Sequence, residues 1–221
     1  MISSVADFGE TLKTTFLNKV ITLHGVSWED YKVLQKAIEI ERPRMKMSLC
    51  RGKLTILTAA TLFHEIIKTT LEGIISLTMM KTRREIIATG QATMRSASEQ
   101  IATEPDASYF IQNADSVELK NYVADELDLA PDLVVEIEEN YKSDDKFEIY
   151  AAFGIKEFWL YDARVLRMFE LSKTGEYLLI EKSIALPILT GEVLTQFLNR
   201  SQTEDQFQVL LDFEKWLQEN K

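Results

Sequence analysis

The sequence predicts a mixed α/β (α+β) fold in which a central β-sheet is flanked by helices. Its 221 residues suffice for one sizeable core but not for two large ones. Hydrophobic residues make up 46% of the chain and charged residues 27%, which is the balance of an ordinary globular protein. Segments with helical periodicity are interspersed with short β-branched and aromatic runs, as expected for strands packed beside helices.

The first half of the chain contains two helical patterns and several strand patterns. Apolar residues at helical spacing predict a helix that ends before Pro43, and a longer apolar stripe predicts the longest helix. β-forming residues on both sides of Arg51-Gly52 predict a hairpin. A polar, acidic stretch without clean periodicity predicts a loop. In order, the predicted elements are helix 28–41, strands 45–50 and 53–57, helix 59–81, two short strands within 85–97, strand 108–112 and loop 113–129.

The second half begins with an apolar run that predicts a buried strand. The helix after it has Ser143 or Asp144 as its N-cap candidate and Gly154 as its C-terminal stop. Thr174-Gly175 predicts a hairpin turn, and the final helix is expected to pack on its own core. In order, the predicted elements are strand 133–137, helix 144–153, strands 157–161, 165–171 and 176–181, helix 190–198, the polar linker 199–205 and a last helix over 207–217.

Composition limits the class of protein. Asp7 and Glu10 lie where a secretory signal would need a basic start and an apolar run, and no apolar stretch reaches membrane-spanning length. We therefore expect a cytoplasmic protein that does not associate with membranes. Cys50 is the only cysteine, which excludes an intramolecular disulfide and a cysteine-based metal cluster. The net charge of −10 is unusual for a DNA-binding protein, although a local basic groove can coexist with an acidic exterior.

Carboxylates gather on the predicted buried strand. Side chains alternate along a strand, so Asp132, Glu136 and Glu138 share one face while apolar residues occupy the other. The Cα atoms of Asp132 and Glu136 would be about 13 Å apart, too far for both to ligate one ion. A second ligand must then be Glu138, about 6 to 7 Å away, or Asp106 in a separate segment. Asp132, which follows Pro131, is more simply explained as the start of the strand.

A site with oxygen ligands suits Mg²⁺ or Mn²⁺, which take one or two carboxylates together with water and substrate phosphate. Phosphodiester hydrolysis also needs a cation near the attacking water or the developing negative charge. Lys146 is the candidate, because Ile149, Tyr150 and Phe153 follow it at helical spacing and place it on the inward-facing stripe. The alternative is that Lys146 forms only an ion pair with Glu136.

These residues resemble a known family. The segment 131–137 (PDLVVEI), followed by Lys146, Tyr150, Gly154 and the strand 157–162 (EFWLYD), is similar to the bacterial putative restriction endonuclease family, a branch of the PD-(D/E)xK nuclease superfamily. The likeness covers roughly residues 25–198. Further segments that carry it are 25–28 (GVSW), 52–56 (GKLTI), His64-Glu65, 104–106 (EPD), Tyr109 and 111–113 (IQN).

The resemblance implies a restriction endonuclease-like core with an N-terminal helix and hairpin and a C-terminal helical extension. The domain limits would be an N-terminal extension over 1–24, the core over 25–198 and a helical extension over 199–221. Asp106 and Glu136 would be the metal ligands, Lys146 the catalytic cation and Glu65 a further acid. The superfamily's simplest pattern has lysine two residues after the strand acid, where this chain has Glu138, so the resemblance implies that the cation has migrated to the helix.

The leading prediction is a metal-dependent DNA endonuclease. Asp106 and Glu136 would hold Mg²⁺ (or Mn²⁺) against the scissile phosphate, Lys146 would orient or activate the attacking water, and Glu65 would assist. The rival is a catalytically silent member of the same fold that acts as a binding or regulatory module, as a homodimer through its terminal helix. The acidic net charge favours the rival, as does Ala107, which stands where a further acid is common in relatives.

Overall fold

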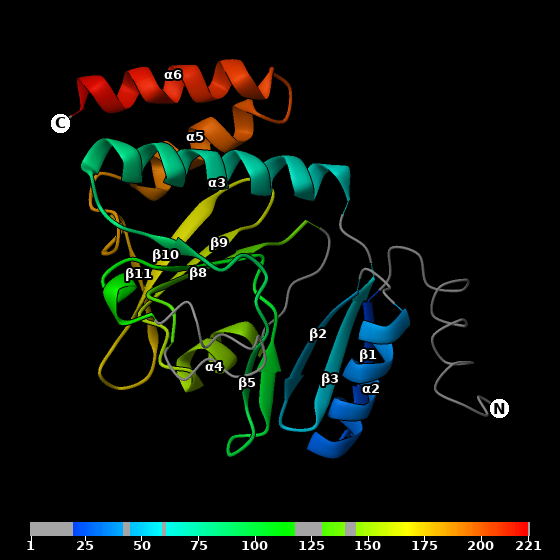
Figure 1. The fold of residues 1–221 in the computed structure, drawn as a ribbon. Helices are drawn as coiled ribbons and strands as arrows, with labels where there is room; N and C mark the ends of the chain where they lie inside the picture. The colour runs from blue at the N-terminus through cyan, green and yellow to red at the C-terminus, as the bar shows by residue number, and fades with distance from the viewer. Residues whose placement is uncertain (1–19, 42–44, 59–60, 118–129, 140–144, 221) are drawn as a thin grey trace. The chain divides into compact units, whose positions relative to one another are not determined.

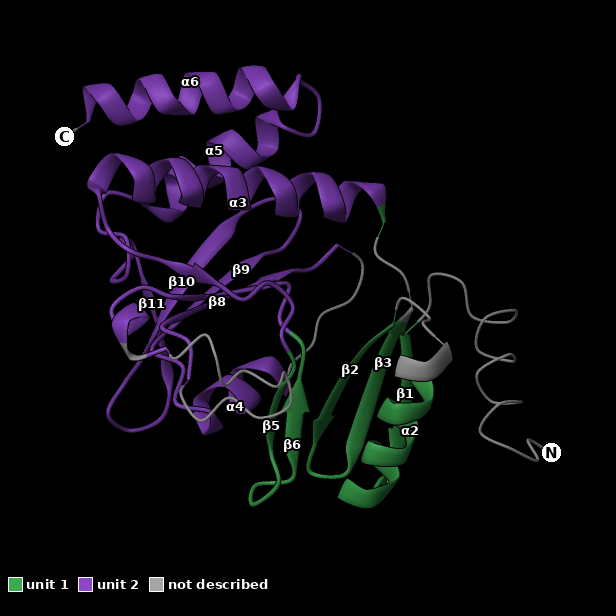
Figure 2. Cartoon of the chain, in the orientation of Figure 1, with its two compact units in different colours: residues 1–61, 93–104 green, residues 62–92, 105–221 purple. Residues whose placement is uncertain are grey.

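The computed structural model describes residues 20–41, 45–58, 61–117, 130–139 and 145–220 (Figure 1). The chain forms two compact units (Figure 2). Unit 1 comprises residues 1–61 and 93–104, and unit 2 comprises residues 62–92 and 105–221. The predicted domain limits follow the family resemblance instead and stay a prediction.

Unit 1 is a five-stranded sheet covered by one helix. All of its strand pairs are antiparallel, in the order β1-β3-β2-β6-β5. Its core joins Tyr31 of the helix to apolar residues of the central strands, among them Met47 and Leu54. The elements are β1 (Val20–His24), α2 (Trp28–Glu41), β2 (Met45–Cys50), β3 (Lys53–Thr58), β5 (Met94–Ser96) and β6 (Ile101–Thr103).

Local sequence explains two features of unit 1. Arg51 and Gly52 have φ values of 46° and 74°, the left-handed backbone that a two-residue hairpin turn requires. Ser27 caps the start of α2, because its hydroxyl accepts from the backbone N–H of Asp30 at 3.1 Å. The Asp30 carboxylate accepts in return from the backbone N–H of Ser27, also at 3.1 Å. The hairpin and the helix are therefore fixed by short-range contacts.

Unit 2 contains a six-stranded mixed sheet in the order β11-β10-β9-β8-β7-β4. The central pair, β8 and β9, is parallel, and the other pairs are antiparallel. All five residues of β8 are buried, as its apolar run predicts. The strands are β4 (Ile87–Ala88), β7 (Ala107–Phe110), β8 (Leu133–Ile137), β9 (Glu157–Tyr161), β10 (Leu166–Leu171) and β11 (Tyr177–Ile180).

Helices cover both faces of this sheet (Figure 1). Leu133, Val135 and Ile137 of β8 belong to the same core as Ile67 and Ile74 of α3. The short helix α4 lies on the opposite face (Figure 1). Helix α5 contacts both β10 and α3, and α6 packs against α3. The helices are α3 (Leu62–Thr82), α4 (Asp145–Ala152), α5 (Gly191–Arg200) and α6 (Gln206–Glu219).

Most predicted elements are confirmed, with differences at their ends. The last helix packs on its own core, since Phe213 belongs to the same cluster as the α3 residues. Strands β1 and β6 were not predicted; β1 pairs with β3 and β6 pairs with β2. The expected loop after β7 contains a 3₁₀ turn over Ala114–Ser116, and its remainder from 118 lies outside the described residues. The N-cap candidates at 143 and 144 also lie outside them.

Candidate active site

Glu136 is a buried carboxylate paired with a buried lysine. Only 4% of Glu136 is exposed, and the Nζ atom of Lys146 lies 2.6 Å from its Oε1 atom. The hydroxyl of Tyr150 donates to the same oxygen. Lys146 and Tyr150 are four residues apart, so both project from one face of α4 toward β8. The prediction that Lys146 stems from the inward-facing stripe is confirmed, as is its contact with Glu136.

The second predicted carboxylate, Asp106, is fixed beside the same strand. Asp106 is 1% exposed and precedes β7. Its backbone N–H donates to the carbonyl of Val135 at 3.0 Å, and its Oδ2 atom accepts from the N–H of Ile137 at 2.8 Å. The Asp106 carboxylate therefore contacts the peptide unit that directly follows Glu136. Strand pairing places Asp106 beside the two neighbours of Glu136, Val135 and Ile137, although the two acids are thirty residues apart in the sequence.

His64, in the first turn of α3, contacts Asp106. Its Nε2 atom lies 3.0 Å from Asp106 Oδ1, and its side chain is 12% exposed. Its Nδ1 atom lies 3.4 Å from a carboxylate oxygen of Glu65. Sequence reasoning named His64 only as the neighbour of Glu65 and did not connect it to Asp106. Its contact with Asp106 is set by the packing of α3 on the sheet.

Glu65 differs from the other predicted site residues in exposure and in partners. Its side chain is 49% exposed, and its described contact is with His64. Lys68, three residues further along α3, pairs with Glu72 at 4.0 Å. The His64 imidazole therefore contacts the carboxylates of both Glu65 and Asp106.

Asp132 has a structural role, as expected from its position after Pro131. Its Oδ2 atom accepts from the backbone N–H groups of Ile111 and Asn113 at 2.8 and 3.0 Å. Its Oδ1 atom accepts from the side-chain amide of Asn113 at 2.7 Å. The carboxylate therefore fastens the segment after β7 to the start of β8.

Glu157 is a further buried carboxylate, which the sequence analysis did not single out. It is 1% exposed and accepts from the Trp159 indole at 2.6 Å and from the backbone N–H groups of Ile184 and Ala185 at 3.0 and 2.6 Å. Burial raises the pKa of Glu157, although these hydrogen bonds act in the opposite direction. These partners indicate a structural role, in which Glu157 joins β9 to the segment that contains Ile184 and Ala185.

The predicted ligands are of the donor type that a hard divalent cation takes. The Asp106 carboxylate accepts from the peptide N–H that follows Glu136, and each ionised carboxylate offers about four lone-pair positions. Within the described ranges, no group of three or more His, Cys, Asp or Glu residues could hold a metal ion. Glu138 therefore does not complete such a group there. Mg²⁺ commonly uses only one or two protein carboxylates, so a two-carboxylate set remains chemically suitable.

A protein-family model matches most of the chain. The model of the Uma2 family, described as putative restriction endonuclease, matches residues 28–200. This chain belongs to the Uma2 family. The family predicted from the sequence is therefore confirmed, and the mixed sheet with helices on both faces is consistent with the restriction endonuclease-like superfamily.

One solved structure supports the fold. It is described as a putative nuclease belonging to DUF820 from Anabaena variabilis ATCC 29413. It aligns with this Uma2 chain at a TM-score of 0.55 and 17% sequence identity, covering 78% of this chain and 99% of that one. At this identity the likeness shows a shared fold. No curated protein matches the chain, and none of the helices that the structure describes could cross a lipid bilayer.

Proposed function

We propose that this protein is a metal-dependent nuclease that hydrolyses phosphodiester bonds of DNA in unit 2. The observation that carries the proposal is the buried contact of Glu136 with Lys146 at 2.6 Å, one peptide unit from the buried Asp106. Ionised groups are costly to bury, so a lysine and two carboxylates at one point of a sheet indicate a functional site. Membership of the Uma2 family supports the same activity.

Asp106 and Glu136 would hold Mg²⁺ or Mn²⁺. The bound ion would polarise a phosphoryl oxygen and lower the pKa of a bound water. Both carboxylates are held by neighbours, Asp106 by the Ile137 N–H and Glu136 by the Tyr150 hydroxyl. Partners of this kind orient metal-binding carboxylates and reduce their freedom to turn away. His64 would act in the same way on the other oxygen of Asp106.

Lys146 would supply the positive charge at the scissile phosphate. In hydrolysis the water oxygen forms a bond to phosphorus, the ester P–O bond breaks, and the proton from water passes to solvent or to the leaving oxygen. Negative charge on the phosphoryl oxygens is offset by a fixed cation, which is worth most in a site shielded from water. Lys146 is 4% exposed and held on α4, so its ammonium is already oriented. Glu65 would act indirectly, because it contacts His64 and His64 in turn contacts Asp106.

The test is cleavage of supercoiled plasmid with Mg²⁺ or Mn²⁺ at low salt. Glu136→Gln and Lys146→Met should each reduce nicking by about 100-fold or more. Matched controls are Glu170→Gln and Lys156→Met, which alter exposed residues of the same unit and should nick at the wild-type rate. Nicking that persists in both site variants would contradict the proposal, since it would come from another site or from a contaminant.

The second candidate is a silent Uma2 fold that acts as a binding module. Two observations favour it, namely the net charge of −10 and the lack of a three-residue metal group among the described residues. The predicted homodimer belongs to this candidate. Phe207 and Leu211 of α6 are 70% and 41% exposed, so an apolar strip on α6 is available to a second copy. Metal-independent DNA binding without nicking, together with a dimeric mass in solution, would support it.

A further inference from the structure

The two units carry opposite net charges. Unit 1 contains ten Lys and Arg residues against eight Asp and Glu, a net charge of +2. Unit 2 contains fifteen against twenty-seven, a net charge of −12. The whole-chain value of −10 is therefore the sum of a slightly basic unit and a strongly acidic one. Affinity for nucleic acid depends on the local field at the binding surface, so unit 1 is judged by its own charges.

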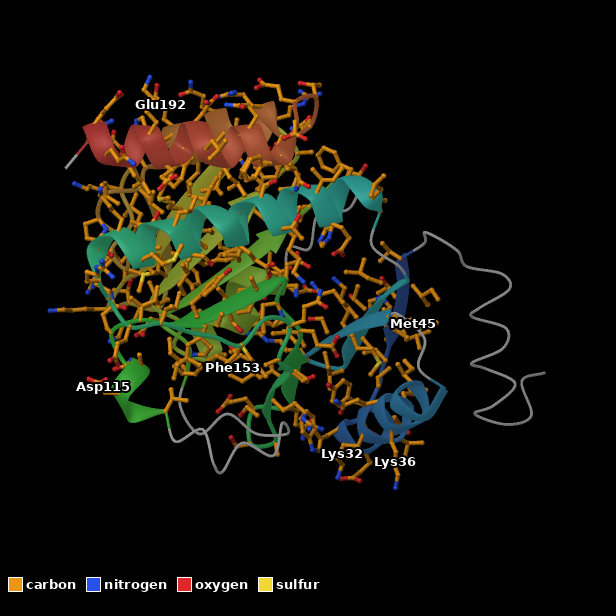
Figure 3. The ribbon with its side chains drawn as sticks, turned by 45° about the horizontal axis from the view of Figure 1, so that its top comes forward. Lys32, Lys36, Met45, Asp115, Phe153 and Glu192 are labelled. Atoms are coloured by element: carbon orange, nitrogen blue, oxygen red, sulfur yellow. The ribbon has the colours of Figure 1, made fainter. Side chains whose placement is uncertain are left out.

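Most of the described cations of unit 1 lie on α2 and on the β2–β3 hairpin; Arg95 lies on β5 and donates to the side chain of Gln35. Lys32 and Lys36 are four residues apart and exposed, so they form one row along α2 (Figure 3). The hairpin turn contributes Arg51 and Lys53, and it lies against the start of α2 through the hydrogen bond from Val26 N to Gly52 O at 3.0 Å. We call Lys32, Lys36, Arg51 and Lys53 the basic surface of unit 1.

Acids at the start of α2 are engaged in local contacts. The Asp30 carboxylate accepts from the Ser27 hydroxyl at 2.6 Å, and the hydrogen bonds from Ser27 lower the pKa of Asp30. Glu29 pairs with Lys32 at 2.7 Å, with side chains 77% and 45% exposed. An exposed ion pair of this kind is weak in water, so a phosphate can replace Glu29 as the partner of Lys32.

We propose that the basic surface of unit 1 binds the phosphate backbone of DNA. This rests on the proposed function, because it takes DNA as the partner. Lysines that contact phosphates give affinity without sequence specificity and make binding depend on salt.

The experiment measures binding of the full chain to a short fluorescein-labelled duplex by anisotropy, in EDTA so that no cleavage occurs. The test variant is Lys32→Glu/Lys36→Glu. The matched control is Lys173→Glu/Lys182→Glu, which makes the same charge change at exposed residues of unit 2. The test variant should bind roughly ten-fold or more weakly, and its salt dependence should be less steep by about 0.9 for each lost phosphate contact. The control should bind like wild type.

Equal weakening of both variants would overturn the proposal, because it would show a general charge effect. Unchanged binding in the test variant would overturn it as well. Plasmid nicking separates these results from the proposed function: nicking together with equal weakening leaves the nuclease intact and removes only the role of unit 1. Weakening confined to the test variant without any nicking supports the basic surface and overturns the enzyme. If wild type neither binds nor nicks DNA, both fail.

Discussion

The two ends of the unit 2 sheet hold their buried carboxylates in different ways. At the end where β8 and β9 begin, Asp132 and Glu157 accept hydrogen bonds from backbone N–H groups of other segments. At the opposite end, Glu136 contacts the side chains of Lys146 and Tyr150, and Asp106 contacts the side chain of His64 as well as the backbone N–H of Ile137. Both ends bury acids to a similar degree, with all four residues at most 4% exposed.

The difference shows that burial of an acid does not by itself indicate a site. Carboxylates that accept from backbone N–H groups have partners that cannot leave without unfolding the segment. Carboxylates that contact lysine, histidine or tyrosine have partners that can move or exchange with a metal, a water or a phosphate. The end of the sheet with Asp106 and Glu136 is therefore the chemical end, and the end with Asp132 and Glu157 is the structural end. Four predictions test this division.

The largest effect is expected for Lys146→Met. It leaves Glu136 buried without its cation, which should destabilise the fold by about 3–5 kcal/mol as well as abolish nicking. The double variant Glu136→Gln/Lys146→Met removes both charges, so it should regain most of that stability and remain inactive. Urea unfolding and plasmid nicking check both expectations. A single variant as stable as wild type would show that the pair is not a buried ion pair.

The next largest effect is expected for Asp132→Ala at the structural end. It removes the acceptor of two backbone N–H groups, and each unsatisfied group costs about 1–3 kcal/mol. Asp132→Asn keeps one carbonyl oxygen and should lose less. Nicking per folded molecule should match wild type in both variants, as measured below the unfolding transition. A folded Asp132→Asn protein that cannot nick DNA would move Asp132 to the chemical end.

A smaller effect is expected for His64→Ala. Loss of the imidazole frees Asp106 to turn, and removal of such a supporting partner typically weakens metal binding about 10- to 100-fold. His64→Asn retains an N–H donor and should recover part of the affinity. The other histidine of the chain, His24, is exposed in unit 1, so His24→Ala is the matched control. Mn²⁺ titration calorimetry measures all three, and equal affinities would remove His64 from the site.

The smallest effect is expected in the pH dependence of stability due to Glu157. Burial raises its pKa above the usual 4.5, so above about pH 4.5 the unfolded chain releases this proton while the folded chain keeps it. The stabilising contribution is thus complete at lower pH and is lost as the pH rises through the raised pKa. The free energy of unfolding of wild type relative to Glu157→Gln should fall over this interval. A constant difference from pH 4 to 7 would contradict the shift.

Much of the fold and part of the site could be predicted from the sequence. The apolar run of β8 identified a buried strand, and its interruption by Glu136 marked that acid as unusual. Helical spacing from Lys146 to Tyr150 placed the lysine on the buried face of α4. Local signals also positioned the β2–β3 hairpin at Arg51-Gly52. Each of these features depends on residues close together in the chain, where periodicity and turn preference operate.

The tertiary structure alone decided which partners each acid has. Asp106 reaches Ile137, and His64 reaches Asp106, only because β7 pairs with β8 and α3 packs over the sheet. Likewise, Glu157 binds Ile184 and Ala185, which are distant in sequence. Such contacts depend on strand register and helix packing, and a single sequence contains no local signal for either. The sequence by itself therefore determined the elements and the residue types, and the long-range packing decided which carboxylates are structural and which can do chemistry.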